Sequence, residues 1–375
     1  MKRQREPLGK LCKLVKGISP ISKTPPGPYS LVTTSEEHKT ADTFQFDGEA
    51  VCIPTVSSTG HGHASLKRVH YQAGKFALSN ILVAAQVKDV SVMSTRYLAW
   101  YLTYTKDRLI VPLMTGAANM SLSVDRLATV PVEFPSLSDQ ERIVNLLDEA
   151  VELRKLRSQA DLLTTALIPA LFYEMFVCRE SKDWQKVRLG EVAEVKSGAG
   201  FPMDRQGLLD QSIPFFKVGD MNARGNEWGM HIFRHSISEG TRKELGAILL
   251  PAGSVIFPKV GGAIGTNKKR VLVRASCVDN NVMAILPGRK VMSNFLLALL
   301  AAKNIADFAS NANPPSIRKT TVENWRITLP PLSLQGEFSN TAAEIRGLEA
   351  EQATSRSNLD ALFQSLLHHA FQRDL

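Results

Sequence analysis

FPSLSDQ at residues 134–140 returns as LPPLSLQ at residues 329–335, 195 residues further along the chain. Phe176 and Phe371 have the same spacing, so the register holds without a gap to the end of the segment that follows each motif. A repeat of this length decides how many structural units a chain contains, and it must be recognised before a fold is predicted. The sequence therefore predicts two copies of one structural plan.

Each motif marks the start of a predicted long helix. The proline keeps the chain extended, and Ser138 or Ser333 is predicted to cap the free N–H groups of the first turn. Glu141 completes a capping box in the first copy, whereas Gly336 stands there in the second. Apolar residues then recur every three or four positions, as on one face of a helix. The residues predicted to pair the two helices are Ile143, Leu146, Ala150, Leu153, Leu163, Leu167, Ile345, Leu348, Leu359, Leu362 and Leu366.

These narrow apolar stripes are typical of an antiparallel coiled coil or helix bundle. Forty helical residues would extend over about 60 Å. Pro169 lies inside the first helix pattern and is predicted to kink the helix or to end its regular part near Ile168, because proline has no N–H for the helical hydrogen bond. The alternative is two ordinary amphipathic helices in a single core, which explains less well why they repeat without gaps around a repeated globular unit.

The charge of the chain is divided by segment. Residues 1–135 hold 16 Lys/Arg against 10 Asp/Glu, and residues 184–331 hold 20 against 11. Residues 136–183 hold 6 against 9, and residues 332–375 hold 3 against 6. Basic blocks suggest a polyanionic partner, whereas acidic helices are poor candidates for lying on phosphate. The alternative is surface charge that only keeps the protein soluble.

Several classes of protein are not expected. No apolar run approaches the roughly 20 residues that span a membrane, and the basic N-terminus is not followed by the apolar core of a signal peptide. Cys12, Cys52, Cys178 and Cys277 lie far apart, with no Cys-x-x-Cys spacing. This pattern favours small buried residues in a reducing cytosol over disulfides or zinc. We therefore expect a cytoplasmic protein without membrane contact.

The globular blocks also repeat, with spacings that vary from 181 to about 204 residues. Short strands mixed with a few helices predict a mixed α/β domain that is used twice. The varying spacing indicates loop insertions on a shared framework that presents two different binding surfaces. The matching pairs are residues 7–17 with 188–198, 51–54 with 255–258, 76–80 with 276–280, 95–105 with 293–308, 115–121 with 310–316, and 130–134 with 325–329.

The order of block, Pro-x-Leu-Ser-x-Gln, long helix, second block, Pro-Pro-Leu-Ser-x-Gln and second helix resembles the specificity subunit of type I restriction–modification systems over essentially the whole chain. WQKVRLGEV at residues 184–192 also resembles the usual opening of a target-recognition domain, although the first block has Arg3 where the tryptophan would fall. The resemblance implies two similar target-recognition domains separated by two long antiparallel helices, with an internal pseudo-two-fold repeat. The implied segments are 1–136 (domain 1), 137–178 (spacer helix), 184–331 (domain 2) and 332–375 (second spacer helix), with 178–184 as the linker.

The family resemblance also implies a mechanism. Each target-recognition domain would read one half of a bipartite site in double-stranded DNA, and the paired helices would set the unread gap between the halves. Two modification subunits would dock on the helices and bind S-adenosylmethionine, so no cofactor is expected in this chain. A restriction subunit is a further candidate partner, for cleavage. Half-site spacing then follows from the geometry of the protein, as in dimeric DNA readers.

The best candidate for a DNA-facing loop is GGAIGTNKKR at residues 261–270, because its glycines allow close approach and its cations can meet phosphates. Residues 58–64 form the matching loop in the first half. The alternative for these segments and for the loops at 115–121 and 310–316 is plain turn chemistry. The candidate DNA-binding residues are His61, His63, Lys67, Arg68, Asn119, Ser121, Lys217, Lys259, Asn267, Lys268, Lys269, Arg270, Asn313, Ser316 and Arg318.

No motif in the chain indicates catalysis. His61 and His63 lack further ligands for a metal, and residues 261–270 match neither a Walker A motif nor Gly-x-Gly-x-x-Gly. NPPS at residues 313–316 lacks the aromatic residue of the Asn-Pro-Pro-aromatic motif of adenine methyltransferases. Two alternatives stay open: a DNA adenine methyltransferase in its own right, which would bind S-adenosylmethionine alone, and a coiled-coil scaffold, which would ignore duplex DNA at any salt concentration.

Overall fold

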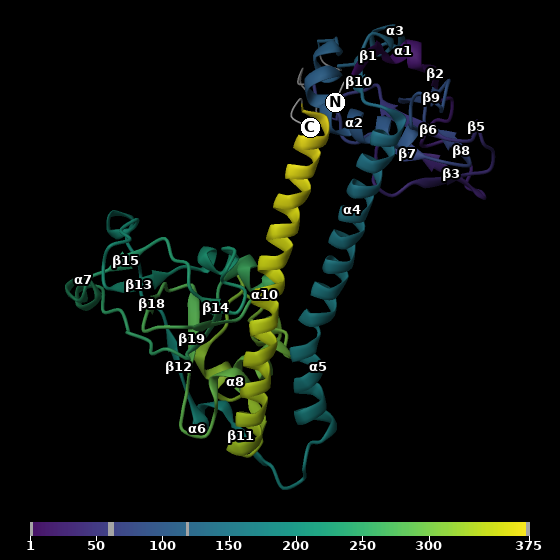
Figure 1. Cartoon of the computed structure of the whole chain (residues 1–375). Helices are drawn as coiled ribbons and strands as arrows, with labels where there is room; N and C mark the ends of the chain where they lie inside the picture. The colour runs from purple at the N-terminus through teal and green to yellow at the C-terminus, as the bar shows by residue number, and fades with distance from the viewer. Residues whose placement is uncertain (1–2, 59–63, 118–119, 373–375) are drawn as a thin grey trace. The chain divides into compact units, whose positions relative to one another are not determined.

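The computed structural model describes residues 3–58, 64–117 and 120–372. The chain divides into two compact units, unit 1 (Met1–Ser158 with Ser355–Leu375) and unit 2 (Gln159–Thr354). Figure 1 follows the chain through them by colour. Each unit holds one globular domain and parts of both long helices. The boundary between compact units therefore cuts through the helices.

The first long helical segment is α4 (Leu137–Thr165), α5 (Leu167–Tyr173) and a π-helical turn, η2 (Glu174–Cys178). The second is a single helix, α10 (Leu332–Phe371). The break between α4 and α5 confirms the predicted effect of Pro169, which cannot donate a hydrogen bond to the carbonyl four residues before it.

The predicted helix caps were wrong by two residues. The N–H of Asp139 donates to the Ser136 Oγ at 3.3 Å, so Ser136 caps α4, and Ser138 lies within the first turn. In the second copy Pro331 precedes α10, and Ser333 is likewise its second residue. Both hydroxyl residues of the first motif suit a cap, and only the start of the helix distinguishes them.

The two glutamines of the repeated motif are fully buried and fasten each helix to its domain. The Gln140 Oε1 accepts a hydrogen bond from the Ser94 N–H at 2.9 Å. Its Nε2 donates to the carbonyls of Val92 (2.9 Å) and Pro135 (3.0 Å). In unit 2 the Gln335 amide has three equivalent partners, the N–H of Met292 and the carbonyls of Lys290 and Pro330. The motif is therefore repeated because one amide satisfies three buried backbone groups.

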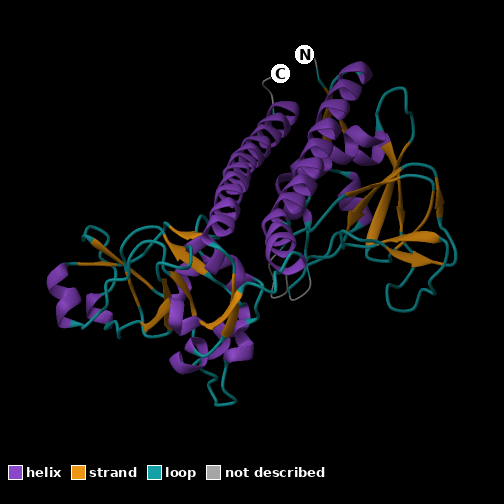
Figure 2. Cartoon of the chain, turned by 90° about the horizontal axis from the view of Figure 1, so that it is seen from below, coloured by secondary structure: helices purple, strands orange, loops and turns teal. Residues whose placement is uncertain are grey.

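In unit 1 a two-stranded ribbon, two sheets and short helices build the domain (Figure 2). The ribbon pairs β1 (Gln4–Pro7) with β10 (Pro131–Phe134). The sheets have the orders β2 (Cys12–Lys16), β9 (Leu82–Val87), β6 (Ala50–Pro54), β7 (His70–Gln72), and β4 (Lys39–Ala41), β3 (Tyr29–Val32), β8 (Lys75–Leu78), β5 (Phe46–Asp47). The helices are α1 (Leu8–Leu11), α2 (Thr95–Leu109), η1 (Val111–Leu113) and α3 (Val124–Ala128).

Unit 2 repeats this arrangement. Its ribbon pairs β11 (Gln185–Arg188) with β20 (Arg326–Leu329). Its sheets have the orders β12 (Ala193–Ser197), β19 (Val282–Pro287), β16 (Val255–Pro258), β17 (Arg270–Leu272), β14 (Gly229–Met230), and β15 (Ser236–Ile237), β13 (Ile213–Phe216), β18 (Cys277–Val278). Its helices are α6 (Leu189–Val192), η3 (Met203–Arg205), η4 (Val218–Asn222), α7 (Glu239–Glu244), η5 (Gly261–Thr266), α8 (Ser293–Ala301), η6 (Ile305–Phe308) and α9 (Lys319–Glu323).

The two domains share one topology, as the sequence repeat predicted. The order β2-β9-β6-β7 corresponds to β12-β19-β16-β17, and the parallel pair β3–β8 corresponds to β13–β18. The central strands β6 and β16 are buried at every residue, which is why both are continuous apolar runs. The short helices α3 and α9 were not predicted, and α8 ends at Ala301 rather than near Phe308.

Each unit contains the start of its own long helix and the end of the other one. In unit 1 the Phe371 ring lies 5.7 Å from that of Tyr97. In unit 2 the Phe176 ring lies 4.9 Å from Phe295 and 5.3 Å from Phe338. The two phenylalanines that align in the sequence repeat thus occupy equivalent places in the two cores.

The helices are antiparallel within unit 1. The Arg154 Nε contacts the Asp360 Oδ1 at 2.7 Å. Trp100 donates to the Asp148 Oδ1 at 3.1 Å and packs on Phe363 with ring centroids 6.0 Å apart. Residue numbers therefore rise along α10 as they fall along α4, as predicted.

The predicted pairing stripe was only partly right. Ile143 and Ile345 are buried, and Ala150, Leu359 and Leu366 are half-buried. The stripe that faces inward on α4 is shifted and includes Val144 and Leu147. The predicted pairing residues that are instead exposed are Leu146, Leu153, Leu163, Leu167, Leu348 and Leu362. Amphipathic periodicity finds an apolar face but does not say what covers it.

Residues Leu137–Cys178 form the one helical stretch of the described chain that is long and apolar enough to cross a membrane, with a mean hydropathy of 1.5 in its most apolar window. Only 22 % of that window is buried. A single stretch of this kind is weak evidence for a membrane span, because core helices of other proteins have the same length and hydropathy. Ile168, Phe172 and Phe176 in this stretch belong to the core of unit 2.

Candidate nucleic-acid interface

The glycine-rich segment of unit 2 is a short 3-10 helix, η5, rather than an open loop. Asn267 ends it with a φ of 53°, in the left-handed region that asparagine tolerates better than most residues. The Asn267 Oδ1 accepts hydrogen bonds from the Lys269 Nζ (2.6 Å) and the Ile305 N–H (2.9 Å). This oxygen holds η5 against η6, so it is not free to read a base.

Two of the predicted phosphate contacts face inward. Lys269 is only 6 % exposed, its Nζ donates to the Lys303 carbonyl at 2.7 Å, and burial lowers its pKa to about 8. Half-buried Arg270 donates to the carbonyls of Lys269 (2.8 Å) and Met221 (3.2 Å), and burial lowers its pKa as well. Both cations hold neighbouring segments of the domain together. The prediction that Lys269 meets phosphate was wrong, because its side chain is buried, whereas for partly exposed Arg270 it stays a prediction.

Three other lysines of unit 2 keep their charge at the surface. Each is partly exposed and donates to a neutral oxygen rather than to a carboxylate. The Lys217 Nζ lies 3.0 Å from the Gln206 Oε1, and the Lys259 Nζ lies 3.1 Å from the Ser197 Oγ. Lys268 donates to the side chain of Asn222. These ammonium groups therefore remain available to an anion.

The end of β16 meets the loop that precedes α9. The Lys259 N–H donates to the Asn281 carbonyl (2.8 Å), and the Ile317 N–H donates to the Lys259 carbonyl (2.8 Å). An isolated bridge then joins Val260 to Ser316. The predicted residues Lys259, Ser316 and exposed Arg318 therefore lie on this strand end and the loop bridged to it, and exposed Asn313 lies in the same loop.

Unit 1 has the same backbone arrangement. The Thr55 N–H donates to the Ile81 carbonyl (2.9 Å), and the Leu122 N–H donates to the Thr55 carbonyl (2.8 Å). The bridge here joins Val56 to Ser121. Thr55 and Ser121 thus correspond to Lys259 and Ser316.

Of the other DNA-binding candidates of unit 1, only Lys67 and Arg68 lie within the described residues. Lys67 is exposed, whereas Arg68 forms an ion pair with Glu36 at 2.7 Å. Three candidates, His61, His63 and Asn119, lie outside the described residues.

A cavity of about 500 Å³ adjoins this bridge in unit 1. Lys16, Asn80 and Arg126 line it together with Ser121, and none of the first three was predicted. These residues carry no sequence motif. They come together only because the fold places β2, the turn before β9 and α3 around the end of β6. The one signal in the sequence was the position of Lys16 beside Gly17 in the loosely repeated segment 7–17.

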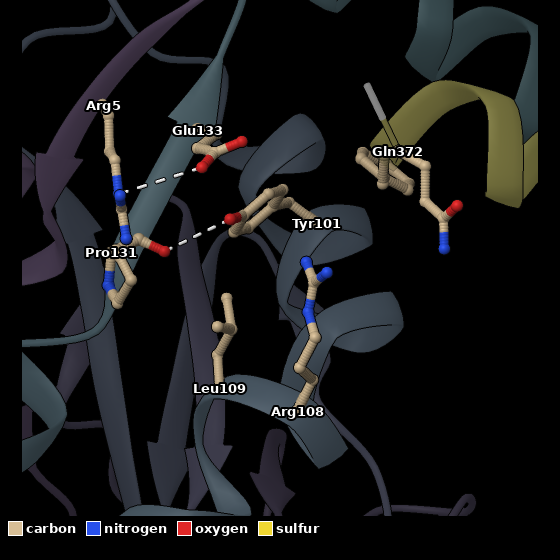
Figure 3. A pocket seen from close by; sticks show the side chains of 8 residues that line it. Arg5, Tyr101, Arg108, Leu109, Pro131, Glu133 and Gln372 are labelled. Atoms are coloured by element: carbon tan, nitrogen blue, oxygen red, sulfur yellow. Dashed lines mark hydrogen bonds and ion pairs between the residues drawn. The ribbon is translucent and has the colours of Figure 1, made fainter. Parts of the chain in front are cut away.

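A second cavity of about 540 Å³ lies in unit 1 where the β1–β10 ribbon and α2 meet the end of α10 (Figure 3). The Arg5 Nε lies 3.8 Å from the Glu133 Oε1, and the Tyr101 hydroxyl donates to the Pro131 carbonyl at 3.2 Å. Arg108 also lines it. None of the residues that line this cavity was predicted to contact DNA.

The chain matches the family model for the Type I restriction modification DNA specificity domain twice, over residues 4–160 and 181–341. Among curated proteins it is similar to the Type I restriction enzyme MjaIX specificity subunit of Methanocaldococcus jannaschii, with 22 % identity over 256 residues. That similarity covers 63 % of this chain and 58 % of the relative, so the chain spans little more than half of the relative's length.

Two solved structures have a similar fold. The S subunit of a type I restriction–modification system from M. genitalium has a TM-score of 0.63 at 14 % identity, covering 99 % of this chain and 96 % of that chain. A chain from a study of complex assembly and conformational transition of the type I R-M system has a TM-score of 0.61 at 18 % identity, covering 100 % of this chain and 98 % of that chain.

Proposed function

The chain belongs to the family of type I restriction–modification DNA specificity domains, and on that premise we propose that it is the DNA specificity subunit of such a system. Each globular domain reads one half of a split site in double-stranded DNA. The observation that best supports DNA as the partner of both domains is one surface feature found in each of them, a strand end bridged to a hairpin or loop. It carries Lys259, Ser316 and Arg318 in unit 2, and Thr55 and Ser121 in unit 1.

This subunit is non-catalytic, as its family is. In our proposal the chemistry is done by two modification subunits, which bind S-adenosylmethionine and methylate adenine. A restriction subunit adds cleavage, and the assembly works in the cytoplasm. The basic charge of both globular blocks supports DNA as the partner, since cations that displace counterions from phosphate supply much of the affinity for DNA.

The modification subunits dock on the exposed leucines of the long helices. Leu146, Leu153, Leu156 and Leu163 on α4 are spaced by seven or three residues and are 44–72 % exposed. Such a row has the spacing of a coiled-coil seam that lacks its partner helix. Contiguous exposed apolar patches mark sites of interaction with proteins or other partners. Leu348 on α10 in unit 2 and Leu362 on α10 in unit 1 are exposed as well.

The helices also set the gap between the half-sites. α10 runs for 40 residues without a break, and a continuous helix keeps its two ends at a defined separation. Inserting two heptads at matched positions in α4 and α10 is expected to lengthen the unread gap and leave both half-site sequences unchanged. Unchanged gap length would contradict this role.

The test of the whole proposal is a domain exchange. The chain is produced with its modification subunit, and the methylated adenines are mapped by sequencing. Replacing residues 184–331 with the second domain of another family member is expected to change one half of the site only, and replacing residues 1–136 is expected to change the other. If neither half changes, the assignment of domains to half-sites is wrong. If this chain alone binds S-adenosylmethionine, it is a methyltransferase instead.

A further inference from the structure

The cavity at the end of β2 in unit 1 carries positive charge and neutral polar groups together. Lys16 and Arg126 provide the cations, and Asn80, Thr115 and Ser121 provide the polar groups. Among the described residues that line it, none is acidic. We propose that this cavity holds a phosphate of the DNA backbone. We call this arrangement the clamp, and unit 2 has an equivalent clamp of its own. The proposal rests on the proposed function and adds where, and by which residues, the strand is held.

The two cations of the cavity are available to an anion. Lys16 is exposed, and although its carbonyl accepts a hydrogen bond from the Gln45 Nε2 at 2.9 Å, its ammonium group has no hydrogen-bond or ion-pair partner among the described residues. The Arg126 Nη1 donates to the Leu113 carbonyl at 3.2 Å, which orients the guanidinium without neutralising it. A phosphate would therefore gain two charge-assisted contacts without breaking an ion pair.

Unit 2 puts a lysine at the same place from a different strand. Lys16 is the last residue of β2, and Ser197 is the last residue of β12. Thr55 follows β6, and Lys259 follows β16. The lysine and the hydroxyl residue have thus exchanged positions between the domains. The Lys259 Nζ lies 3.1 Å from the Ser197 Oγ, so the two positions are close enough for either one to supply the ammonium group.

The arginine has exchanged positions in the same way. Ser123 precedes α3 and Arg318 precedes α9, so these two residues are equivalent. Three residues later stand Arg126 in unit 1 and Thr321 in unit 2. Residues three apart on a helix lie on the same face, so the guanidinium has moved by one turn and stays on the same side. Ser123 itself lines the cavity, which places Arg318 at a cavity-lining position.

These exchanges distinguish a phosphate contact from base reading. A base edge demands a donor or acceptor in one defined geometry, whereas a phosphate accepts a cation from several directions. Both domains keep one lysine, one arginine and two hydroxyl residues at this place while changing which position holds each. The clamp is therefore sequence-independent, and bases are read by other residues of each domain.

The test uses the complex of the full chain with its modification subunits and two duplexes, one carrying the mapped site and one of unrelated sequence. Lys16→Ser is expected to weaken binding to both duplexes by about tenfold, and to lower the slope of log affinity against log salt by about one. Lys16→Ser with Thr55→Lys copies the arrangement of unit 2 and is expected to restore both values. Lys23→Ser, which removes an exposed lysine of the same domain outside the cavity, is the matched control.

Three results would overturn the clamp: Lys16→Ser binding like the unaltered complex, failure of the double variant to recover, or a changed methylated sequence in Lys16→Ser. Recovery in the double variant also shows that the single variant had not simply misfolded. If the unaltered complex neither methylates nor binds either duplex, the proposed function fails and the clamp with it. If it methylates normally and only the variants disagree, the clamp alone is wrong.

Discussion

Unit 1 and unit 2 agree most closely where geometry is most demanding. Gln140 and Gln335 make the same three hydrogen bonds to the same kinds of backbone group. At the cavity beside β2 the units agree only in the kinds of side chain, because Lys16 ends β2 whereas Lys259 follows β16. A buried amide with three fixed partners has no substitute of the same shape, whereas a surface cation can be supplied from either of two neighbouring positions.

The units also differ in what covers the end of a long helix. Each unit contains the end of the long helix that begins in the other unit. In unit 2 the linker covers this end, where Trp184 packs on Phe176 with ring centroids 6.3 Å apart and the Thr328 hydroxyl donates to the Glu180 Oε1 at 2.9 Å. Unit 1 has Arg3 at the position of the tryptophan, and a cavity lies beside the equivalent strand (Figure 3). The two cores are therefore alike as far as the rings of Phe176 and Phe371, and they differ in the residues that cover those rings.

The largest effects are expected from the equivalent rings at these helix ends. Phe371→Ala and Phe176→Ala should each cost about 3–5 kcal/mol, since both rings are buried among aromatic side chains. Hydrogen exchange measured peptide by peptide should show Phe371→Ala loosening unit 1 and Phe176→Ala loosening unit 2. Tyr173→Ala is the control, because that ring is 59 % exposed. If Phe371→Ala loosened unit 2 and Phe176→Ala loosened unit 1, each unit would not contain the end of the other unit's long helix.

The two glutamines should follow, with effects that match each other. Gln140→Ala and Gln335→Ala each leave three buried backbone groups without a partner, and we expect each to cost about 3 kcal/mol of unfolding free energy. Denaturant unfolding of the purified chain measures both, and exposed Gln159→Ala on α4 should cost almost nothing. A large effect at only one glutamine would show that the same three hydrogen bonds contribute differently to the stability of the two units.

The sequence was sufficient for the repeat and not for the faces of its elements. The constant spacing from Gln140 to Gln335 needs no structure to be recognised, and it correctly predicted one topology used twice. Nothing in the spacing says that Leu153 points outward, because α4 is apolar on two sides and tertiary contacts choose between them. The prediction for Lys269 was wrong for the same reason, because the sequence does not show that two of the three consecutive cations, Lys269 and Arg270, face inward. Lys16 and Arg126 were missed because only the fold brings them together.

A smaller effect should separate the units by pH. Burial, followed by the nearby charges of His38 and Arg68, lowers the pKa of His70 to about 4, whereas the equivalent position of unit 2 holds Arg270. The unfolded chain binds this proton near pH 6.5, so stability falls between pH 6.5 and 4. The loss should be on the order of 1 kcal/mol, since solvent screens a half-buried imidazole. His70→Gln should flatten the pH dependence of unit 1 in hydrogen exchange, and an unchanged profile would contradict this cause.

The smallest effect on stability is expected from the exposed leucines, and it would sharpen the contrast between the inward and outward sides of α4. Leu153→Gln and Leu163→Gln should change the unfolding free energy of the isolated chain by less than about 0.5 kcal/mol, because these side chains are 54 % and 72 % exposed. Leu147→Gln is the matched comparison and should cost several times more, since Leu147 is 1 % exposed. In co-purification the two exposed variants should instead lose the modification subunit, because a polar group in a helical seam must give up its water. Full retention of that subunit by a chain carrying both changes would mean that the partner docks on another face of the helices.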